Sequence, residues 1–190
     1  MINSNDIFKR GSKTYYYSSI FFDKKTKNNV SKLYAFVRVA DDFVDSSPSN
    51  KTEYLKFKKT YYDALQGKHL QKTKYFEIII DFILLSKEFN FNQKWIDAFF
   101  KSMDFDLEKK VCKTRRDVDN YIHGSAEVIG LMMSRILKIE PGADEYSKKL
   151  GKAMQVINFI RDIKEDYSLN RLYIPDFYSK KLFKINQCLD

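Results

Sequence analysis

The amino-acid sequence predicts an all-α fold. Apolar residues recur with a period close to 3.6 in one segment after another, and no stretch keeps the alternation of a β-strand. Glycine and proline are scarce, 6 and 3 among 190 residues, so we expect long helices with few turns. The length and the 44% hydrophobic content suit one domain, residues 1–190, with an ample core. Helices are expected at 4–21, 24–45, 51–65, 72–89, 92–107, 114–137 and 144–167, with the start of another at 176–190.

The formal net charge of +9 comes mainly from lysine. Lysines on solvated helix faces account for such a charge, and attraction to anionic lipid or to a polyanionic substrate is the alternative. We expect no nucleic-acid partner, because no arginine-rich helix or aromatic-interleaved basic patch stands out. The two cysteines form no CxxC pair, residues 1–10 lack the apolar core of a signal peptide, and no segment is long enough to span a bilayer. A cytoplasmic protein, soluble or peripheral at a membrane, is therefore expected.

The stretch 33–45 is apolar around most of the predicted helix, which is typical of a buried helix. It nevertheless carries Tyr34, Arg38, Asp41 and Asp45 at spacings of four, three and four. Side chains three or four residues apart on a helix lie roughly 5–6 Å apart at Cβ. Two carboxylates on one face of a buried helix are costly unless a cation or water accompanies them. The pattern predicts a cation site or a hydrated cavity here.

A second acidic stripe runs through 155–166. Gln155, Asn158, Asp162 and Asp166 share one face, with Arg161 beside them and apolar residues between. A single stripe of this kind is more often a hydrated surface seam or a ladder of salt bridges. Two stripes on separate apolar helices, each with a nearby arginine, favour a shared site.

Oxygen ligands of this kind suit Mg²⁺, which binds one or two carboxylates together with substrate phosphates and water. Two acidic stripes that face each other would hold several Mg²⁺ ions against one diphosphate. Arg38, Arg161 and Lys13 would neutralise the remaining phosphate charge. The metal ions would stabilise diphosphate as a leaving group, and an aromatic-rich interior would shield a carbocation from water.

Four motifs, in order along the chain, resemble the squalene/phytoene synthase family. Residues 33–45 and 158–166, the latter followed by Arg171-Leu-Tyr-Ile-Pro175, look like its two aspartate-rich signatures. Ser12-Lys13-Thr14 resembles its N-terminal diphosphate-binding stretch, and 121–130 is similar to its central helix motif. The resemblance covers nearly the whole chain.

The resemblance implies the type I isoprenoid synthase (terpenoid synthase) fold, incomplete at its C-terminus, with residues 1–190 as the N-terminal two-thirds. It also implies head-to-head condensation of two prenyl diphosphates through a cyclopropylcarbinyl diphosphate. We expect the phytoene type, which uses geranylgeranyl diphosphate in carotenoid biosynthesis. The expected cofactor is Mg²⁺, with Mn²⁺ as a substitute, and NADPH only for a squalene synthase. A monomer that contacts a membrane surface is expected.

The resemblance implies a role for each residue that matches a position of a family motif. The expected metal ligands are Asp41, Asp45, Asn158, Asp162 and Asp166. The expected diphosphate contacts are Ser12, Lys13, Thr14, Tyr34, Arg38, Gln155 and Arg161. The expected catalytic residues are Tyr34, Arg38, Tyr121 and Tyr173, and residues 172–175 are expected to form a flap over the site.

Other interpretations stay open at this point. A squalene or dehydrosqualene synthase would use farnesyl diphosphate, and the sequence does not distinguish C15 from C20 substrates. A chain-elongating synthase or a terpene cyclase of the same fold is another alternative, and the Asp-x-x-x-Asp spacing of the second motif argues against a chain elongator. A non-catalytic scaffold of the same fold is a further alternative, although all four aspartates are retained. Glu127 departs from the small residue of many relatives, and we expect a structural role facing Lys or Arg.

Overall fold

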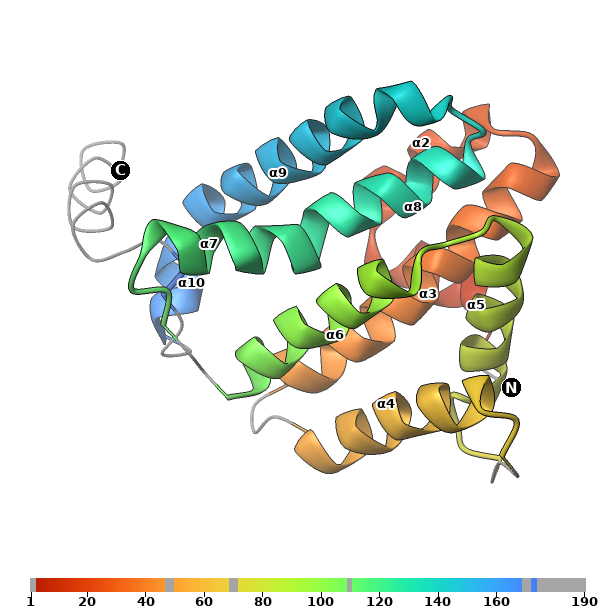
Figure 1. The fold of residues 1–190 in the computed structure, drawn as a ribbon, viewed down its shortest axis with the longest axis horizontal. Helices are drawn as coiled ribbons and strands as arrows, with labels where there is room; N and C mark the ends of the chain where they lie inside the picture. Colours follow the sequence, from red (N-terminus) through yellow and green to blue (C-terminus); the bar gives the residue numbers. More distant parts are fainter. Residues whose placement is uncertain (1–2, 47–49, 69–71, 109–110, 169–171, 174–190) are drawn as a thin grey trace. The chain divides into compact units, whose positions relative to one another are not determined.

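The computed structural model describes residues 3–46, 50–68, 72–108, 111–168 and 172–173, and these residues are almost entirely helical (Figure 1). An isolated parallel β-bridge joins Val111 to Leu172. The predicted all-α class is confirmed, while the helix expected at 176–190 lies outside the described residues. The elements are α1 (Ser4–Gly11), α2 (Lys13–Ser18), η1 (Ser19–Phe21), α3 (Lys24–Asp45), α4 (Lys51–Leu65), α5 (Phe76–Glu88), α6 (Gln93–Leu107), α7 (Arg115–Ile122), η2 (His123–Glu127), α8 (Val128–Ile136), η3 (Pro141–Ala143), α9 (Asp144–Arg161) and α10 (Ile163–Ser168).

The chain forms two compact units, and each is described by itself. The first comprises 1–91 and 135–139, and the second comprises 92–134 and 140–190. The expectation of a single domain concerns the two units together and stays a prediction.

The first unit is built around α3, which packs against α1, α4 and α5. The Asp23 side chain caps α3 by accepting hydrogen bonds from the backbone N–H groups of Lys25 and Thr26. In the core the rings of Phe36 and Phe82 stack with centroids 3.7 Å apart. Aromatic residues, which make up 16% of the sequence, therefore supply much of this core.

The second unit packs η2 against α6, α7 and α9. In Figure 1, α7, η2 and α8 run on from one another alongside α9. Gly124 sits against the backbone of Ala98 in α6, and Gly151 in α9 sits against the backbone of Ala126 in η2. A Cβ atom at Gly151 would lie 2.6 Å from the Ala126 carbonyl oxygen, so glycine is what permits this approach.

Three of the expected helices are interrupted in the structure. The helix expected at 4–21 breaks at Ser12, whose extended backbone ends α1 and whose hydroxyl caps α2. The helix expected at 114–137 contains the π-helical turn η2. The helix expected at 144–167 breaks at Asp162, which ends α9. The helices expected at 24–45 and 51–65 have the predicted bounds.

Candidate active site

The polar stripe of α3 is the open side of an otherwise buried helix. Tyr34 and Arg38 are partly exposed, as is Asp41, and Asp45 is exposed. The intervening apolar side chains of α3 are buried, among them Leu33, Phe36, Val39, Ala40, Phe43 and Val44. The predicted stripe is therefore present as a solvent-accessible seam on a helix that is held in the core of its unit.

Arg38 is held by carboxylates of its own helix. Its guanidinium lies 2.7 Å from an Asp42 carboxylate oxygen and 3.5 Å from one of Asp41. Asp42 was not among the expected site residues, although its (i, i+4) spacing from Arg38 on a helix was visible in the sequence. These pairs orient the guanidinium along the seam.

Tyr34 lies beside the turn between α1 and α2. Its ring contacts that of Phe8, with centroids 4.7 Å apart, and a Cβ atom at Gly11 would lie 2.5 Å from its hydroxyl oxygen. The expected diphosphate-binding stretch starts at Ser12, the next residue, so this stretch begins next to the α3 stripe. Lys13 and Thr14 follow in the first turn of α2 and are exposed.

The electrostatics of the α3 stripe reflect partial burial and close charges. Burial raises the pKa of the Tyr34 phenol, Arg38 lowers it, and Asp41 raises it further. For Arg38, burial disfavours the charged form, but Asp42 and then Asp41 raise its pKa above the usual value. Arg38 is therefore a permanent cation, and Tyr34 is a neutral phenol at neutral pH.

The second acidic stripe lies in the other unit. Gln155 and Asn158 are one turn apart in α9 and within 3.5 Å of each other, Asp162 ends this helix, and Asp166 is in α10. The expected single helical stripe is thus split at Asp162, yet the Asp166 N–H still donates to the Asp162 carbonyl over 2.8 Å. The Arg161 guanidinium donates two hydrogen bonds, of 2.7 and 2.6 Å, to the Asp162 carboxylate.

The second unit also brings together the two expected catalytic tyrosines. Tyr121 in α7 and Tyr173 each donate a hydrogen bond to Asp106 in α6, over 2.8 and 2.6 Å. All three side chains are buried, and Phe159 of α9 stacks on Tyr173. Asp106 was missed in the sequence, where it stands between the acidic residues Asp104 and Glu108 near the end of a helix and resembles part of a solvated surface. Of the expected flap at 172–175, residues 174 and 175 lie outside the described residues.

A metal site on this chain would depend on a few carboxylates and a bound diphosphate. Within the described ranges, no three carboxylate, imidazole or thiol groups of this chain gather in one place. Mg²⁺ bound with a diphosphate needs only one or two carboxylates from the protein. The carboxylates of Asp41 and Asp45, one helical turn apart on an open face, fit that requirement. That the seams of α3 and α9 face each other stays a prediction.

Glu127 and His123 form a local pair in η2. The His123 Nδ1 atom lies 2.9 Å from a Glu127 carboxylate oxygen. Glu127 also raises the pKa of Lys148, after the larger effect of Glu145. The expected lysine is present as Lys148, whose pKa the charge of Glu127 raises, and the hydrogen-bond partner of Glu127 is the histidine one turn away.

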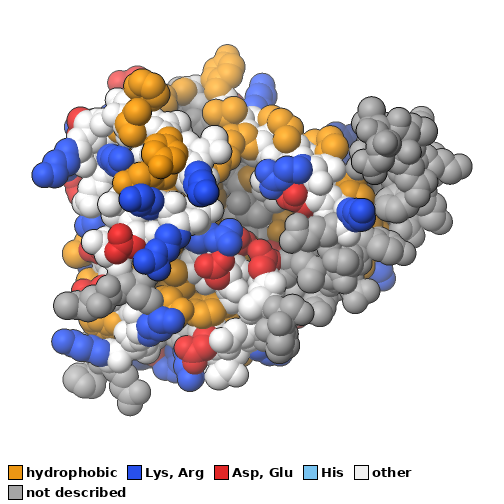
Figure 2. All heavy atoms as spheres, turned by 180° about the vertical axis from the view of Figure 1, so that it is seen from behind, with side chains coloured by type: hydrophobic (Ala, Val, Ile, Leu, Met, Phe, Trp, Pro, Cys, Tyr) orange, Lys and Arg blue, Asp and Glu red, His pale blue; other side chains and the backbone are white. Residues whose placement is uncertain are grey.

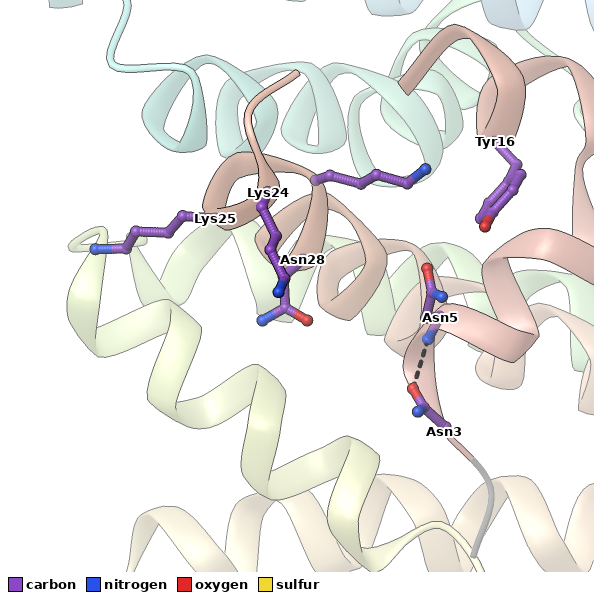
Figure 3. A pocket seen from close by; sticks show the side chains of 7 residues that line it. Asn3, Asn5, Tyr16, Lys24, Lys25 and Asn28 are labelled. Carbon is purple, nitrogen blue, oxygen red and sulfur yellow. Dashed lines mark hydrogen bonds between the residues drawn. The ribbon is translucent and has the colours of Figure 1, made fainter. Parts of the chain in front are cut away.

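A separate polar groove of about 690 Å³ lies in the first unit (Figure 3). Asn3 and Asn5 line it from α1 and its cap, and Lys24, Lys25 and Asn28 line it from α3. Tyr16 and Lys27 complete the lining, and the Lys27 ammonium lies 4.3 Å from the centre of the Tyr16 ring. None of the expected catalytic or metal-binding residues lines this groove.

The chain belongs to the squalene/phytoene synthase family, whose model matches residues 8–181. It is 29% identical over 175 residues to a 4,4'-diapophytoene synthase from Staphylococcus haemolyticus, covering 89% of this chain and 60% of the relative. It is 28% identical over 176 residues to a phytoene synthase from Rhodobacter capsulatus, covering 90% of this chain and 50% of the relative. The chain thus spans between half and three-fifths of the length of these relatives.

Solved structures support the same fold. A crystal structure of a dehydrosqualene synthase in complex with ligand matches with a TM-score of 0.81 and 26% identity, covering 94% of this chain and 62% of the other. A squalene synthase from Alicyclobacillus acidocaldarius matches with a TM-score of 0.70 and 20% identity, covering 90% and 66%. The expected family and fold are confirmed.

Proposed function

We propose that the protein catalyses the Mg²⁺-dependent head-to-head condensation of two prenyl diphosphates. Membership of the squalene/phytoene synthase family supports this reaction class. The observation that carries the proposal is the seam of α3, where Tyr34, Arg38, Asp41 and Asp45 remain accessible on a helix whose other faces are buried. A single stripe could also be a hydrated seam with salt bridges, and it is the second stripe with its own arginine, Arg161, together with the family membership, that favours catalysis over a scaffold.

Each expected residue has a definite task in this proposal. Asp41 and Asp45 would hold Mg²⁺, together with Asn158, Asp162 and Asp166 of the second stripe. Bound Mg²⁺ would neutralise the charge that develops on the departing diphosphate. Arg38 would contact diphosphate oxygens through its fork of N–H donors, while Asp42 keeps it oriented.

The remaining diphosphate contacts come from both units. Ser12, Lys13 and Thr14 would bind one substrate beside Tyr34, because Gly11 lies against the Tyr34 hydroxyl. Gln155 and Arg161 would bind diphosphate from α9. Mn²⁺ would be able to take the place of Mg²⁺ at this site, since both ions prefer oxygen ligands.

The proposed reaction has two steps, and each step releases one diphosphate. The C1–O bond of one substrate breaks, its C1 joins the double bond of the second substrate, and a proton leaves to close the cyclopropane ring. Loss of the second diphosphate then produces a carbocation that rearranges and loses a proton to form phytoene. Tyr121 and Tyr173, whose rings are 4.5 Å apart, would line the place where this cation is held.

Substrate length is the finer part of the proposal. We propose geranylgeranyl diphosphate, with no NADPH required, and farnesyl diphosphate as the alternative. The relatives named for the two product classes are 29% and 28% identical to this chain, so identity does not separate them. Incubation with Mg²⁺ and equal amounts of the two labelled diphosphates should yield mainly C40 product. Mainly C30 product would assign the protein to the dehydrosqualene or squalene class.

The matched variants are Asp41→Asn and Asp81→Asn, whose carboxylates are 36% and 38% exposed on α3 and α5. We expect Asp41→Asn to abolish detectable product and Asp81→Asn to leave the rate within about twofold of the unmodified protein, since surface substitutions are usually mild. Protection from heat by a non-hydrolysable diphosphate analogue should require Mg²⁺ and be lost only in Asp41→Asn. Absence of both product and Mg²⁺-dependent protection would support the scaffold alternative.

We further propose that α2 and η1 contact an anionic membrane surface. Tyr17, Ile20 and Phe21 are 61%, 61% and 87% exposed, and Lys24 and Lys25 begin α3 after Phe22 and the capping residue Asp23. Figure 2 shows exposed hydrophobic side chains close to Lys and Arg side chains on this face. Apolar side chains beside lysines suit the boundary between acyl chains and anionic head groups. In the described part of the chain, no helix is long and apolar enough to cross a bilayer.

Vesicle sedimentation tests this surface. Binding to vesicles with 30 mol % phosphatidylglycerol is expected to exceed binding to pure phosphatidylcholine, because each lysine near an anionic surface contributes roughly 1 kcal/mol of binding free energy. Added salt should weaken this binding, since it screens the charges. Phe21→Ser should reduce binding, whereas Leu84→Ser, at a site 56% exposed on α5, should not. Equal loss in both variants would contradict a role for this segment.

A further inference from the structure

A buried carboxylate joins three separate segments of the second unit. Asp106, at the end of α6, is 3% exposed, and each of its two carboxylate oxygens accepts one phenol proton. Tyr121 donates to Oδ2 over 2.8 Å and Tyr173 donates to Oδ1 over 2.6 Å. Hydrogen bonds to an ionised acceptor are short and strong, and a buried carboxylate without them is costly.

The two hydrogen bonds fix the positions of aromatic rings as well as hydroxyl groups. The ring centroids of Tyr121 and Tyr173 are 4.5 Å apart, and Phe159 stacks on Tyr173 at 4.9 Å with an interplanar angle of 9°. Phe159 is adjacent in sequence to Asn158, an expected metal ligand of α9. Tyr173 is therefore packed against the same helix that carries the second acidic stripe.

The backbone near Tyr173 is attached at the same place. The Cys112 N–H donates to the Leu172 carbonyl oxygen over 2.8 Å, within the bridge between Val111 and Leu172. Asp106 secures the side chain of the next residue. The backbone bond alone leaves the Tyr173 ring able to rotate about its side-chain torsions, so the carboxylate supplies the orientation.

Two titratable groups near Asp106, the Tyr121 phenol and the Cys112 thiol, have raised pKa values. Burial raises the pKa of Tyr121 well above its ordinary value, and Asp106 and then Tyr173 raise it further. Burial also raises the pKa of the Cys112 thiol to about 12, with smaller contributions from Asp117 and Asp106. The Tyr121 phenol therefore remains protonated and can keep donating to the carboxylate.

We propose that Asp106 is a positioning residue, whose carboxylate holds the phenols of Tyr121 and Tyr173 so that their rings form a fixed aromatic wall at the reaction centre. The proposal rests on the function proposed above and adds a residue that touches neither diphosphate nor metal. A fixed pair of ring faces stabilises a cation without reorganising when the charge develops. The negative charge of the buried carboxylate, held at the hydroxyl ends of both rings, favours the same cation.

The central variant is Asp106→Asn, because a carboxamide has one oxygen that accepts hydrogen bonds and one NH₂ that only donates. One phenol then loses its acceptor at almost constant volume. We expect kcat to fall by about 10- to 100-fold, as for supporting groups around other sites, with KM for the prenyl diphosphate changed less than about threefold. Asp106→Glu keeps both acceptors and should recover part of kcat. Ser102→Ala, which alters another buried polar residue of α6, is the matched control.

A double-mutant comparison separates positioning from general damage. In a Tyr121→Phe/Tyr173→Phe background no phenol remains to be held, so adding Asp106→Asn should lower kcat little further. If Asp106→Asn lowers kcat by the same factor in both backgrounds, the positioning role is wrong. If Asp106→Asn does not fold, Tyr173→Phe with Asp106→Glu provides the same comparison.

Nuclear magnetic resonance of tyrosine labelled with ¹³C at Cζ tests the contact without any turnover. The signals of the two tyrosines, assigned from Tyr121→Phe and Tyr173→Phe, should shift in Asp106→Asn, and Tyr121 should ionise at lower pH than in the unmodified protein. Unchanged signals would overturn the proposal. If these signals change as expected while the unmodified protein makes no product, the proposed function fails and the contact stands.

Discussion

Replacement of Gly151 by alanine is expected to destabilise the second unit through a defined backbone clash. The new Cβ atom would lie 2.6 Å from the Ala126 carbonyl oxygen, 3.0 Å from its carbonyl carbon and 3.3 Å from the Glu127 Cα. These are backbone atoms of η2, so no side chain can rotate away. The helices α9 and η2 must separate by several tenths of an ångström along their contact.

The magnitude follows from two opposing effects. Overpacking costs about 1–3 kcal/mol, and a clash with backbone atoms that cannot rotate away belongs to the upper part of this range, about 2–3 kcal/mol, while alanine recovers up to about 1 kcal/mol through its helix propensity. A net loss of about 1–2 kcal/mol should lower Tm by roughly 2–8 °C for a chain of this size. Thermal unfolding followed by circular dichroism at 222 nm measures this shift.

Gly142→Ala is the matched control for this substitution. A Cβ atom at Gly142 has no other atom within 4 Å, so the same exchange meets open space. The expected change is within about 0.5 kcal/mol, as for other surface substitutions. Equal Tm values for Gly151→Ala and the unmodified protein would refute the close approach of α9 to η2.

Three further predictions follow from single contacts. Cys112, which is fully buried and has a thiol pKa of about 12, should resist alkylation at pH 8 until the protein unfolds, as judged by peptide mapping. The pKa of Asp117 is lowered by hydrogen bonds from the side chain and then the backbone of Thr114, so Asp117→Asn should lower Tm at pH 7, and this difference should shrink as the pH falls below about 4. Phe36→Ala should cost about 3–5 kcal/mol in urea unfolding because it removes the ring stacked on Phe82, and a loss below about 1 kcal/mol would contradict that packing.

Local rules predicted much of the helical structure. The bounds of α3 and α4 match those expected, because Asp23 and Asn50 cap their first turns and the apolar period is unbroken between the ends. The interruptions were not predicted. At Ser12 a serine suits a helix cap but also occurs within helices, and the turn η2 depends on Gly124 approaching the backbone of Ala98 in another helix.

The candidate site also has features that local sequence rules predicted and features that depend on the tertiary structure. The stripe of α3 could be predicted, because residues three and four apart on one helix share a face whatever the tertiary structure. Its accessibility on a buried helix, and the placement of Tyr34 beside Gly11, depend on how α1 packs against α3. The ion pair between Arg38 and Asp42 depends on their spacing of four along the helix and on the exposure of this side of α3.

The sequence by itself determined the helical class, the family motifs and the acidic stripe of α3, since each depends on neighbours within about two turns of one helix. Only the tertiary structure decided that Asp106 accepts from Tyr121, 15 positions along the chain, and from Tyr173, 67 positions along. No local pattern encodes such a contact, because burial of that carboxylate depends on α6, α7 and the segment after α10 arriving at the same point. The cost of leaving a buried charge without partners then makes the contact specific.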